Sequence, residues 1–120
     1  MPYVENSENP IVDLSFNFGV RIVQFYKYLA DKKVYVLSKQ LLRCGTSIGA
    51  NVQESIHAQS KADFISKMNI ALKEADETEY WLKLLRKSEI IEEKEYQSLS
   101  KDVKQIIGTL VKIIKNSKVS

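Results

Sequence analysis

Residues 38–57 read SKQLLRCGTSIGANVQESIH and carry the pattern that decides the fold. Apolar side chains recur at spacings of three and four along this stretch, which is typical of the buried stripe of an α-helix. The stripe consists of Leu37, Leu41, Cys44, Ile48 and Val52. Gly45 and Gly49 lie beside it, although glycine costs about 1 kcal/mol relative to alanine inside a helix. We therefore predict that another helix approaches closely at the two glycines and that the bundle packs around this helix.

A line of polar residues runs beside the apolar stripe. Buried polar groups need partners, and carboxylates on the next helix are placed to supply them. The sequence therefore predicts an internal polar network that fixes the register of two helices, with a ligand site as the alternative. The members of this network are Arg43, Ser47, Asn51, Glu54, Glu74 and Glu77.

The whole chain is predicted to be all-α. Both prolines, Pro2 and Pro10, lie near the N-terminus, and strand-like alternation with turn signals is absent. Four helices with short connections give an antiparallel up-down-up-down four-helix bundle over residues 9–118, preceded by a flexible arm at 1–8. The expected helices span about 10–29, 37–58, 61–87 and 92–116. Ser38 is the expected N-cap of the second helix, with a start near Val34 as the alternative.

Two helices carry more apolar surface than one bundle core requires. Phe16, Val20 and Val23 form a second face on the first helix, nearly opposite its core face. The third helix likewise carries Ile70 and Trp81 away from its core seam. A helix of an isolated four-helix bundle needs only one apolar face. We therefore expect something outside the four-helix bundle to cover these surfaces.

Composition places few limits on function. A chain of 120 residues is long enough for one domain with its own core, and its formal net charge of +3 permits nucleic acid as a partner. Cys44 is the single cysteine and is interpreted as a core residue. Neither a signal peptide nor an apolar run long enough for a membrane span is evident. We expect a cytoplasmic protein that does not contact membranes.

One motif suggests catalytic chemistry. Glu54 and His57 have the Glu-x-x-His spacing of di-iron carboxylate bundles, and Glu74 and Glu77 are candidate further ligands. However, His57 is the only histidine, so the second Glu-x-x-His pair of such a site cannot exist. No cofactor-binding motif is present. We therefore expect no enzymatic activity and no cofactor, and keep a metal-dependent bundle enzyme as a remote alternative.

A row of lysines on the last helix is the candidate nucleic-acid site. Residues 101–120 hold five lysines and one acid, Asp102. Phosphate contact needs only positive charge and reach. The alternative is an ordinary solvated helix face, and in that case Tyr80 and Trp81 would mark a protein-interaction scaffold. The candidate RNA- or DNA-binding residues are Lys101, Lys104, Lys112 and Lys115.

Three stretches resemble a known family. The first is the pattern Gln40-x-x-Arg43-x-x-x-Ser47-Ile48-x-x-Asn51-x-x-Glu54. The second is SKADF at 60–64, and the third is KEADETEYWLKLL at 73–85. Together they look like the bacterial four-helix bundle family named for the 23S rRNA intervening sequence. Ser55 departs from the pattern, since many relatives have glycine there, so we expect the second helix to continue past this point.

The resemblance implies a homopentamer of four-helix bundles. The family name records an association with a locus and no activity. The chain is also similar to the accessory protein of diversity-generating retroelements, a basic pentameric bundle that binds nucleic acid and its partner reverse transcriptase. This similarity implies a nucleic-acid enzyme, such as a reverse transcriptase, as a candidate partner. Neither similarity supplies catalytic residues.

Overall fold

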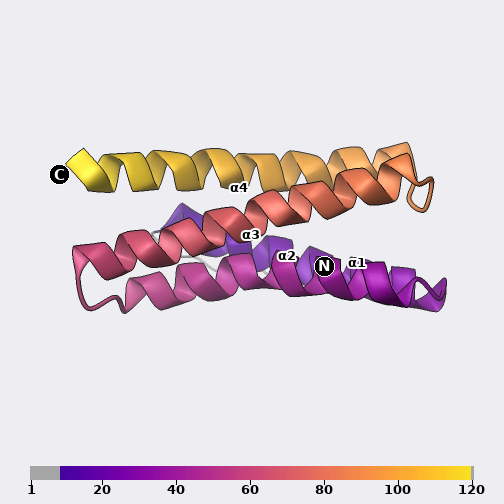
Figure 1. Cartoon of the computed structure of the whole chain (residues 1–120), viewed down its shortest axis with the longest axis horizontal. Coiled ribbons are helices and arrows are strands. Elements are labelled where there is room, and N and C mark those ends of the chain that lie inside the picture. The colour runs from indigo at the N-terminus through magenta and orange to yellow at the C-terminus, as the bar shows by residue number, and fades with distance from the viewer. Residues whose placement is uncertain (1–8, 120) are drawn as a thin grey trace.

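The computed structural model describes residues 9–119 as four long α-helices joined by short turns (Figure 1). The helices are α1 (Pro10–Asp31), α2 (Tyr35–Ile56), α3 (Lys61–Lys87) and α4 (Glu93–Val119). Each helix packs against the next in sequence, and α1 also contacts α4. The predicted all-α four-helix bundle is confirmed. The predicted arm at residues 1–8 lies outside the described residues.

The apolar stripe of α2 lies in the centre of the bundle. Leu41, Cys44, Ile48 and Val52 are all at most 1% exposed. They pack with the core residues of the other three helices, which include Phe18, Ile22, Met68, Leu82, Val103, Ile106 and Leu110. Leu37, the first residue of the predicted stripe, is only partly buried but packs against this core, and the other four positions are confirmed as core residues.

The two glycines of α2 face α1 at short range. A Cβ atom added to Gly45 would lie 2.9 Å from Cγ1 of Ile22, closer than real Cβ contacts. A Cβ added to Gly49 would lie 3.2 Å from the backbone oxygen of Ser15. The close approach predicted from the glycine spacing is confirmed. Side-chain volume at Gly45 would push α1 away, and at Gly49 even a methyl group would be in tight contact with the α1 backbone.

The connection between α1 and α2 is shorter than the sequence predicts. α2 begins at Tyr35, with Val34 at the N-cap position, so the expected start at residue 37 is wrong and the alternative start near Val34 is correct. Ser38 is not the N-cap: it is fully buried, and its hydroxyl donates to the backbone oxygen of Tyr35 at 3.0 Å. A buried serine inside a helix satisfies its hydroxyl in this way.

Two helix ends use a left-handed residue other than glycine. Lys33 after α1 and Glu89 after α3 have φ values of 64° and 60°. After α1, the amide of Val34 donates to the Leu29 carbonyl at 3.0 Å and that of Lys33 donates to Ala30 at 2.8 Å. The end of α3 repeats this pattern. These are Schellman motifs, in which glycine usually occupies the left-handed position.

Replacing Lys33 with glycine is expected to stabilise the protein by about 0.5–1 kcal/mol. A side chain with a Cβ atom is disfavoured in the left-handed conformation, and glycine removes that cost. Urea denaturation measures the change. The same substitution at Lys39, in the interior of α2, is the control and is expected to destabilise by about 1 kcal/mol. A Lys33→Gly variant that is less stable than the parent protein would contradict the left-handed conformation of Lys33.

The start of α3 agrees with the sequence. Ser60 is the N-cap, and its hydroxyl oxygen accepts a hydrogen bond of 3.0 Å from the Asp63 amide. The Asp63 carboxylate accepts in turn from the amide of Gln59, at 3.2 Å, and not from Ser60 as a standard capping box would. α3 then runs to Lys87, as predicted.

The other helix ends lie within a few residues of their predicted positions. α1 continues to Asp31, two residues beyond the expected 29. α2 passes Ser55, as expected from the absent glycine, but ends at Ile56 and not at 58. α4 begins at Glu93 and runs to Val119, three residues past the expected 116. Helix ends are the part of a helix that side-chain periodicity specifies least.

Candidate nucleic-acid interface

The predicted lysines lie together on the outer face of α4. At 3.6 residues per turn, Lys101, Lys104, Lys112 and Lys115 fall within about 80° of one another around the helix. All four are exposed, and the opposite face of α4 carries buried residues such as Val103 and Leu110. We call these four residues the lysine face. Because their ammonium groups extend into solvent from one rigid helix, they are available to phosphates.

Asp102, the single acidic residue in the sequence 101–120, forms its contacts on another side of α4 than the lysine face. Asp102 accepts a hydrogen bond from Arg21 of α1, whose other terminal nitrogen donates to the Ser98 hydroxyl at 2.8 Å. This ion pair offsets the negative charge of Asp102 and links α4 to α1. No local pattern in the sequence points to Arg21, because about 80 residues separate it from its partners Asp102 and Ser98.

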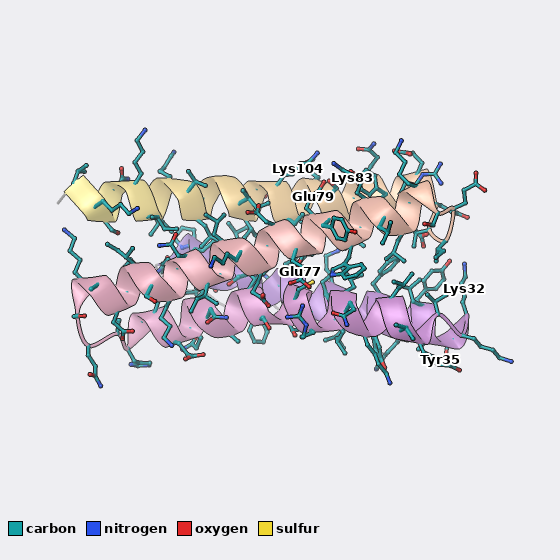
Figure 2. The ribbon with its side chains drawn as sticks, in the orientation of Figure 1. Lys32, Tyr35, Glu77, Glu79, Lys83 and Lys104 are labelled. Atoms are coloured by element: carbon teal, nitrogen blue, oxygen red, sulfur yellow. The ribbon has the colours of Figure 1, made fainter. Side chains whose placement is uncertain are left out.

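A second carboxylate lies beneath the edge of the lysine face. Glu79 of α3 accepts from the Ser100 hydroxyl at 3.0 Å and from the Tyr96 hydroxyl at 3.3 Å. Its side chain is 17% exposed, and Lys104 lies beside it with Nζ 3.9 Å from Oε1 (Figure 2). Lys104 is 65% exposed, so this loose ion pair leaves its ammonium largely hydrated.

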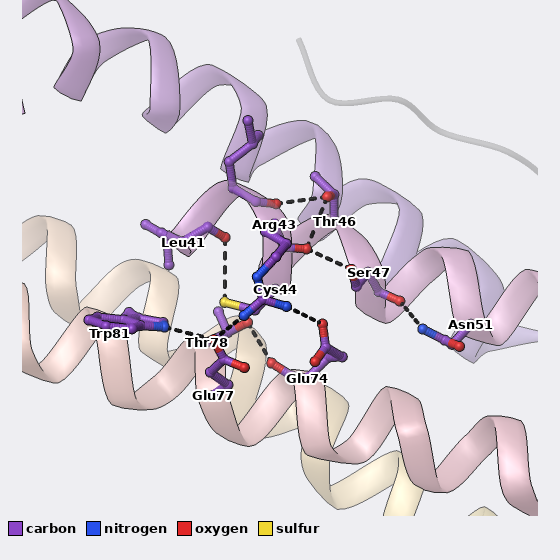
Figure 3. A network of polar contacts seen from close by, with 11 residues as sticks. Leu41, Arg43, Cys44, Thr46, Ser47, Asn51, Glu74, Glu77, Thr78 and Trp81 are labelled. Carbon is purple, nitrogen blue, oxygen red and sulfur yellow. Dashed lines mark hydrogen bonds and ion pairs between the residues drawn. The ribbon is translucent and has the colours of Figure 1, made fainter. Parts of the chain in front are cut away.

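Arg43 joins α2 to α3 through two carboxylates (Figure 3). Its Nη1 donates to Glu74 at 3.2 Å and its Nη2 donates to Glu77, which also accepts from the indole nitrogen of Trp81 at 2.9 Å. The sequence prediction that these carboxylates face Arg43 matches this geometry. Its prediction of burial does not, because the Arg43 side chain is 51% exposed. The pairs bridge the rim of the helix interface, where exposed ion pairs contribute about 1 kcal/mol or less.

The other members of the predicted polar network do not join this bridge. Ser47 donates to the Arg43 carbonyl at 2.7 Å, and Asn51 donates to the Ser47 carbonyl at 2.9 Å, so both bond within α2 (Figure 3). Glu54 is 57% exposed and pairs with Lys67 of α3 at 3.2 Å. The six polar residues therefore form a row along the α2–α3 rim and not one buried cluster.

The Glu54-x-x-His57 motif lies at the end of a helix. His57 is the exposed C-cap of α2, and Glu54 faces Lys67. Glu74 and Glu77 are occupied by Arg43. Within residues 9–119, no group of three or more His, Cys, Asp or Glu side chains is arranged to hold a metal ion. The geometry brings Glu74 and Glu77 together around a guanidinium, and does not bring His57 to them.

Cys44 is fully buried, as the sequence predicts. Its Sγ donates to the Leu41 carbonyl at 3.6 Å. Burial raises the pKa of the Cys44 thiol to about 11. The thiol therefore stays protonated at neutral pH, and the thiolate that a nucleophile requires is scarcely populated.

An apolar groove runs along the outer junction of α1 and α2. Its volume is about 620 Å³. Phe16 and Val23, from the predicted second face of α1, line it and are 48% and 40% exposed. The full lining is Val12, Ser15, Phe16, Gly19, Val20, Val23, Gln24, Thr46, Gly49, Ala50 and Gln53, with no charged side chain among them. The α2 wall of the groove was not predicted, although the cluster of small residues in α2 is the signal that indicates it.

The second apolar surface of α3 is also exposed in part. Ile70 is 39% exposed and Tyr80 is 57% exposed, whereas Trp81 is half-buried against Tyr80 with ring centroids 5.1 Å apart. This surface lies on the outer side of α3, and the groove belongs to α1 and α2. One chain thus presents two different apolar surfaces.

The family follows from a match that covers most of the chain. Residues 7–112 match the model of the 23S rRNA-intervening sequence protein family. The chain belongs to this family. Both this membership and the four-helix fold agree with the resemblance that the α2 and α3 motifs carry. The further similarity to the retroelement accessory protein stays a prediction.

One solved structure is similar to this chain over most of its length. It is a protein of unknown function from the S23 ribosomal protein family of Bacteroides thetaiotaomicron, with 55% sequence identity and a TM-score of 0.86. The match covers 88% of this chain and 98% of that one. No curated protein matches the chain. None of the helices within residues 9–119 has the length and hydropathy needed to cross a membrane.

Proposed function

We propose that this member of the 23S rRNA-intervening sequence proteins is a non-enzymatic, self-associating bundle that binds RNA or DNA through the lysine face. The observation that carries the proposal is the alignment of four exposed lysines on α4, with Asp102 paired to Arg21. Phosphate binding is electrostatic and needs no catalytic group.

Self-association is proposed from the two exposed apolar surfaces. Exposed apolar patches of this kind usually mark sites of interaction with another protein. The α1–α2 groove is concave and uncharged, and the α3 surface projects Ile70 and Tyr80 from a different side. When two different patches of one chain bind each other, a head-to-tail ring results if the rotation closes. The family resemblance implies five subunits, and a ring would repeat the lysine face around its surface and add the fields.

A mobility-shift assay with structured RNA and single-stranded DNA tests nucleic-acid binding. We expect binding at low salt, and at least roughly tenfold weaker binding by the Lys112→Gln/Lys115→Gln variant because two phosphate contacts are lost. The control is Lys27→Gln/Lys39→Gln, which removes two exposed lysines from α1 and α2. If both double variants bind equally, the lysine face is not the site.

The alternative function is a protein-interaction scaffold. The exposed Tyr80 beside Trp81 favours it, because aromatic side chains are enriched at protein interfaces. A pull-down after nuclease treatment separates the two functions, since a scaffold retains its protein partner. A nucleic-acid enzyme such as a reverse transcriptase is the proposed partner if the chain is an accessory protein. Loss of that partner on nuclease treatment favours a bridge made of nucleic acid.

A further inference from the structure

The lysine face is divided into two pairs. Lys101 and Lys104 are three residues apart, as are Lys112 and Lys115, and eleven residues separate the pairs. Eleven residues make about three turns, so the second pair returns to within about 20° of the first and lies about 16 Å further along α4. Within each pair, the two side chains are neighbours on the helix surface.

The segment between the pairs is uncharged. Residues 105–111, QIIGTLV, contain no acidic or basic side chain. Their outward positions are Gln105, Gly108 and the 47% exposed Val111, and a Cβ atom added to Gly108 would meet nothing within 4 Å. The outer face of α4 is therefore positive, then neutral and low in relief, then positive again.

This spacing fits the two backbones of a double helix. The major groove of B-form DNA is about 12 Å wide between its phosphate rims, and the minor groove of A-form RNA is also wide and shallow. The two lysine pairs lie about 16 Å apart along α4. Because lysine side chains are flexible and several ångströms long, their ammonium groups can reach the phosphates on both rims of such a groove. A single strand has closely spaced phosphates and is usually held by stacking on aromatic side chains, which residues 97–119 lack.

We propose that α4 lies across a groove of a double-stranded nucleic acid, with Lys101 and Lys104 on the phosphates of one strand and Lys112 and Lys115 on those of the other. This inference rests on the proposed function and narrows its ligand to a duplex. The neutral segment faces the groove and contacts no phosphate. Binding is independent of sequence, because phosphate contacts carry no base information.

A variant that moves one pair without changing the charge tests the inference. Gln105→Lys/Gly108→Lys/Lys112→Gln/Lys115→Gln keeps four lysines on the same face but shortens the separation to four residues, about 6 Å. Gln105 and Gly108 are exposed, so the fold tolerates both lysines. Fluorescence anisotropy is measured with labelled duplex RNA, duplex DNA and single-stranded RNA of about 20 nucleotides, with circular dichroism to verify folding.

We expect the parent protein to bind a duplex more tightly than the single strand. The relocated variant should lose roughly tenfold in duplex affinity, as much as Lys112→Gln/Lys115→Gln, and match the parent on the single strand. Parental duplex affinity in the relocated variant, or equal parental affinity for duplex and single strand, overturns the inference and leaves the proposed function standing. Absence of parental binding to all three probes overturns both.

Discussion

Replacing Gly45 with valine is expected to destabilise the bundle by about 3 kcal/mol. Even the Cβ atom would lie 2.9 Å from Ile22, and the two methyl groups of valine extend further into α1. Overpacking of a tight core costs about 1–3 kcal/mol, and Ile22 is itself fully buried, so it can move only against other core residues. A loss of this size is a large part of the 5–15 kcal/mol that stabilises a typical domain.

Urea denaturation followed by circular dichroism measures the effect. Gly108→Val is the matched control, because Gly108 is also inside a helix but its Cβ direction is open. There valine is expected to be neutral or stabilising by a few tenths of a kcal/mol, as its helix propensity exceeds that of glycine. Equal stability of the two variants would contradict the close approach of α1 and α2.

Replacing Val23 with aspartate is expected to dissociate the assembly. Val23 lines the α1–α2 groove and is 40% exposed in one chain, so the carboxylate remains hydrated in a monomer. In the proposed interface the same charge would be buried without a partner, which costs several kcal/mol. We therefore expect a folded protein whose mass falls from a multiple of 13.8 kDa to 13.8 kDa.

Multi-angle light scattering measures the mass, and circular dichroism tests the fold. Val111→Asp is the matched control, since Val111 is 47% exposed on α4, away from the groove. It should leave the mass unchanged. A parent protein that is monomeric at micromolar concentration would remove the basis for self-association, and a Val23→Asp variant that keeps the parental mass would exclude the groove as the contact.

The sequence predicted the features that periodicity and small residues encode. The stripe from Leu41 to Val52 is the core of the bundle, and Gly45 and Gly49 mark the approach of α1. Ser60 marks the start of α3 because a serine followed by an aspartate three residues later is a local signal. In each case the signal lies within a single short segment of the chain.

The features that were mispredicted depend on contacts between distant residues or on unusual backbone conformations. Lys33 ends the α1 segment in a left-handed conformation that glycine usually adopts, so nothing in the composition shows that the connection is short. Arg43 was expected to be buried because it is adjacent to the core stripe, but a long side chain reaches the rim and remains half exposed.

The sequence predicts which residues make up the candidate site, but not their exposure or their contacts with other helices. Helical periodicity alone places Lys101, Lys104, Lys112 and Lys115 on one face. Their exposure and the pairing of Asp102 with Arg21 depend on how α4 packs against α1 and α3, which the sequence does not encode locally. The groove likewise requires α1 and α2 together, because each helix contributes one wall.

The salt dependence of RNA binding tests the central claim most directly. Each phosphate neutralised on a duplex contributes about −0.9 to the slope of log K against log salt concentration, and four lysines therefore predict a slope of about −3 to −4 for each bound α4. Fluorescence anisotropy with a duplex RNA, titrated between about 50 and 200 mM salt, gives the slope. A slope near this value supports phosphate binding by the lysine face, and a slope near zero, or no binding at 50 mM salt, contradicts it.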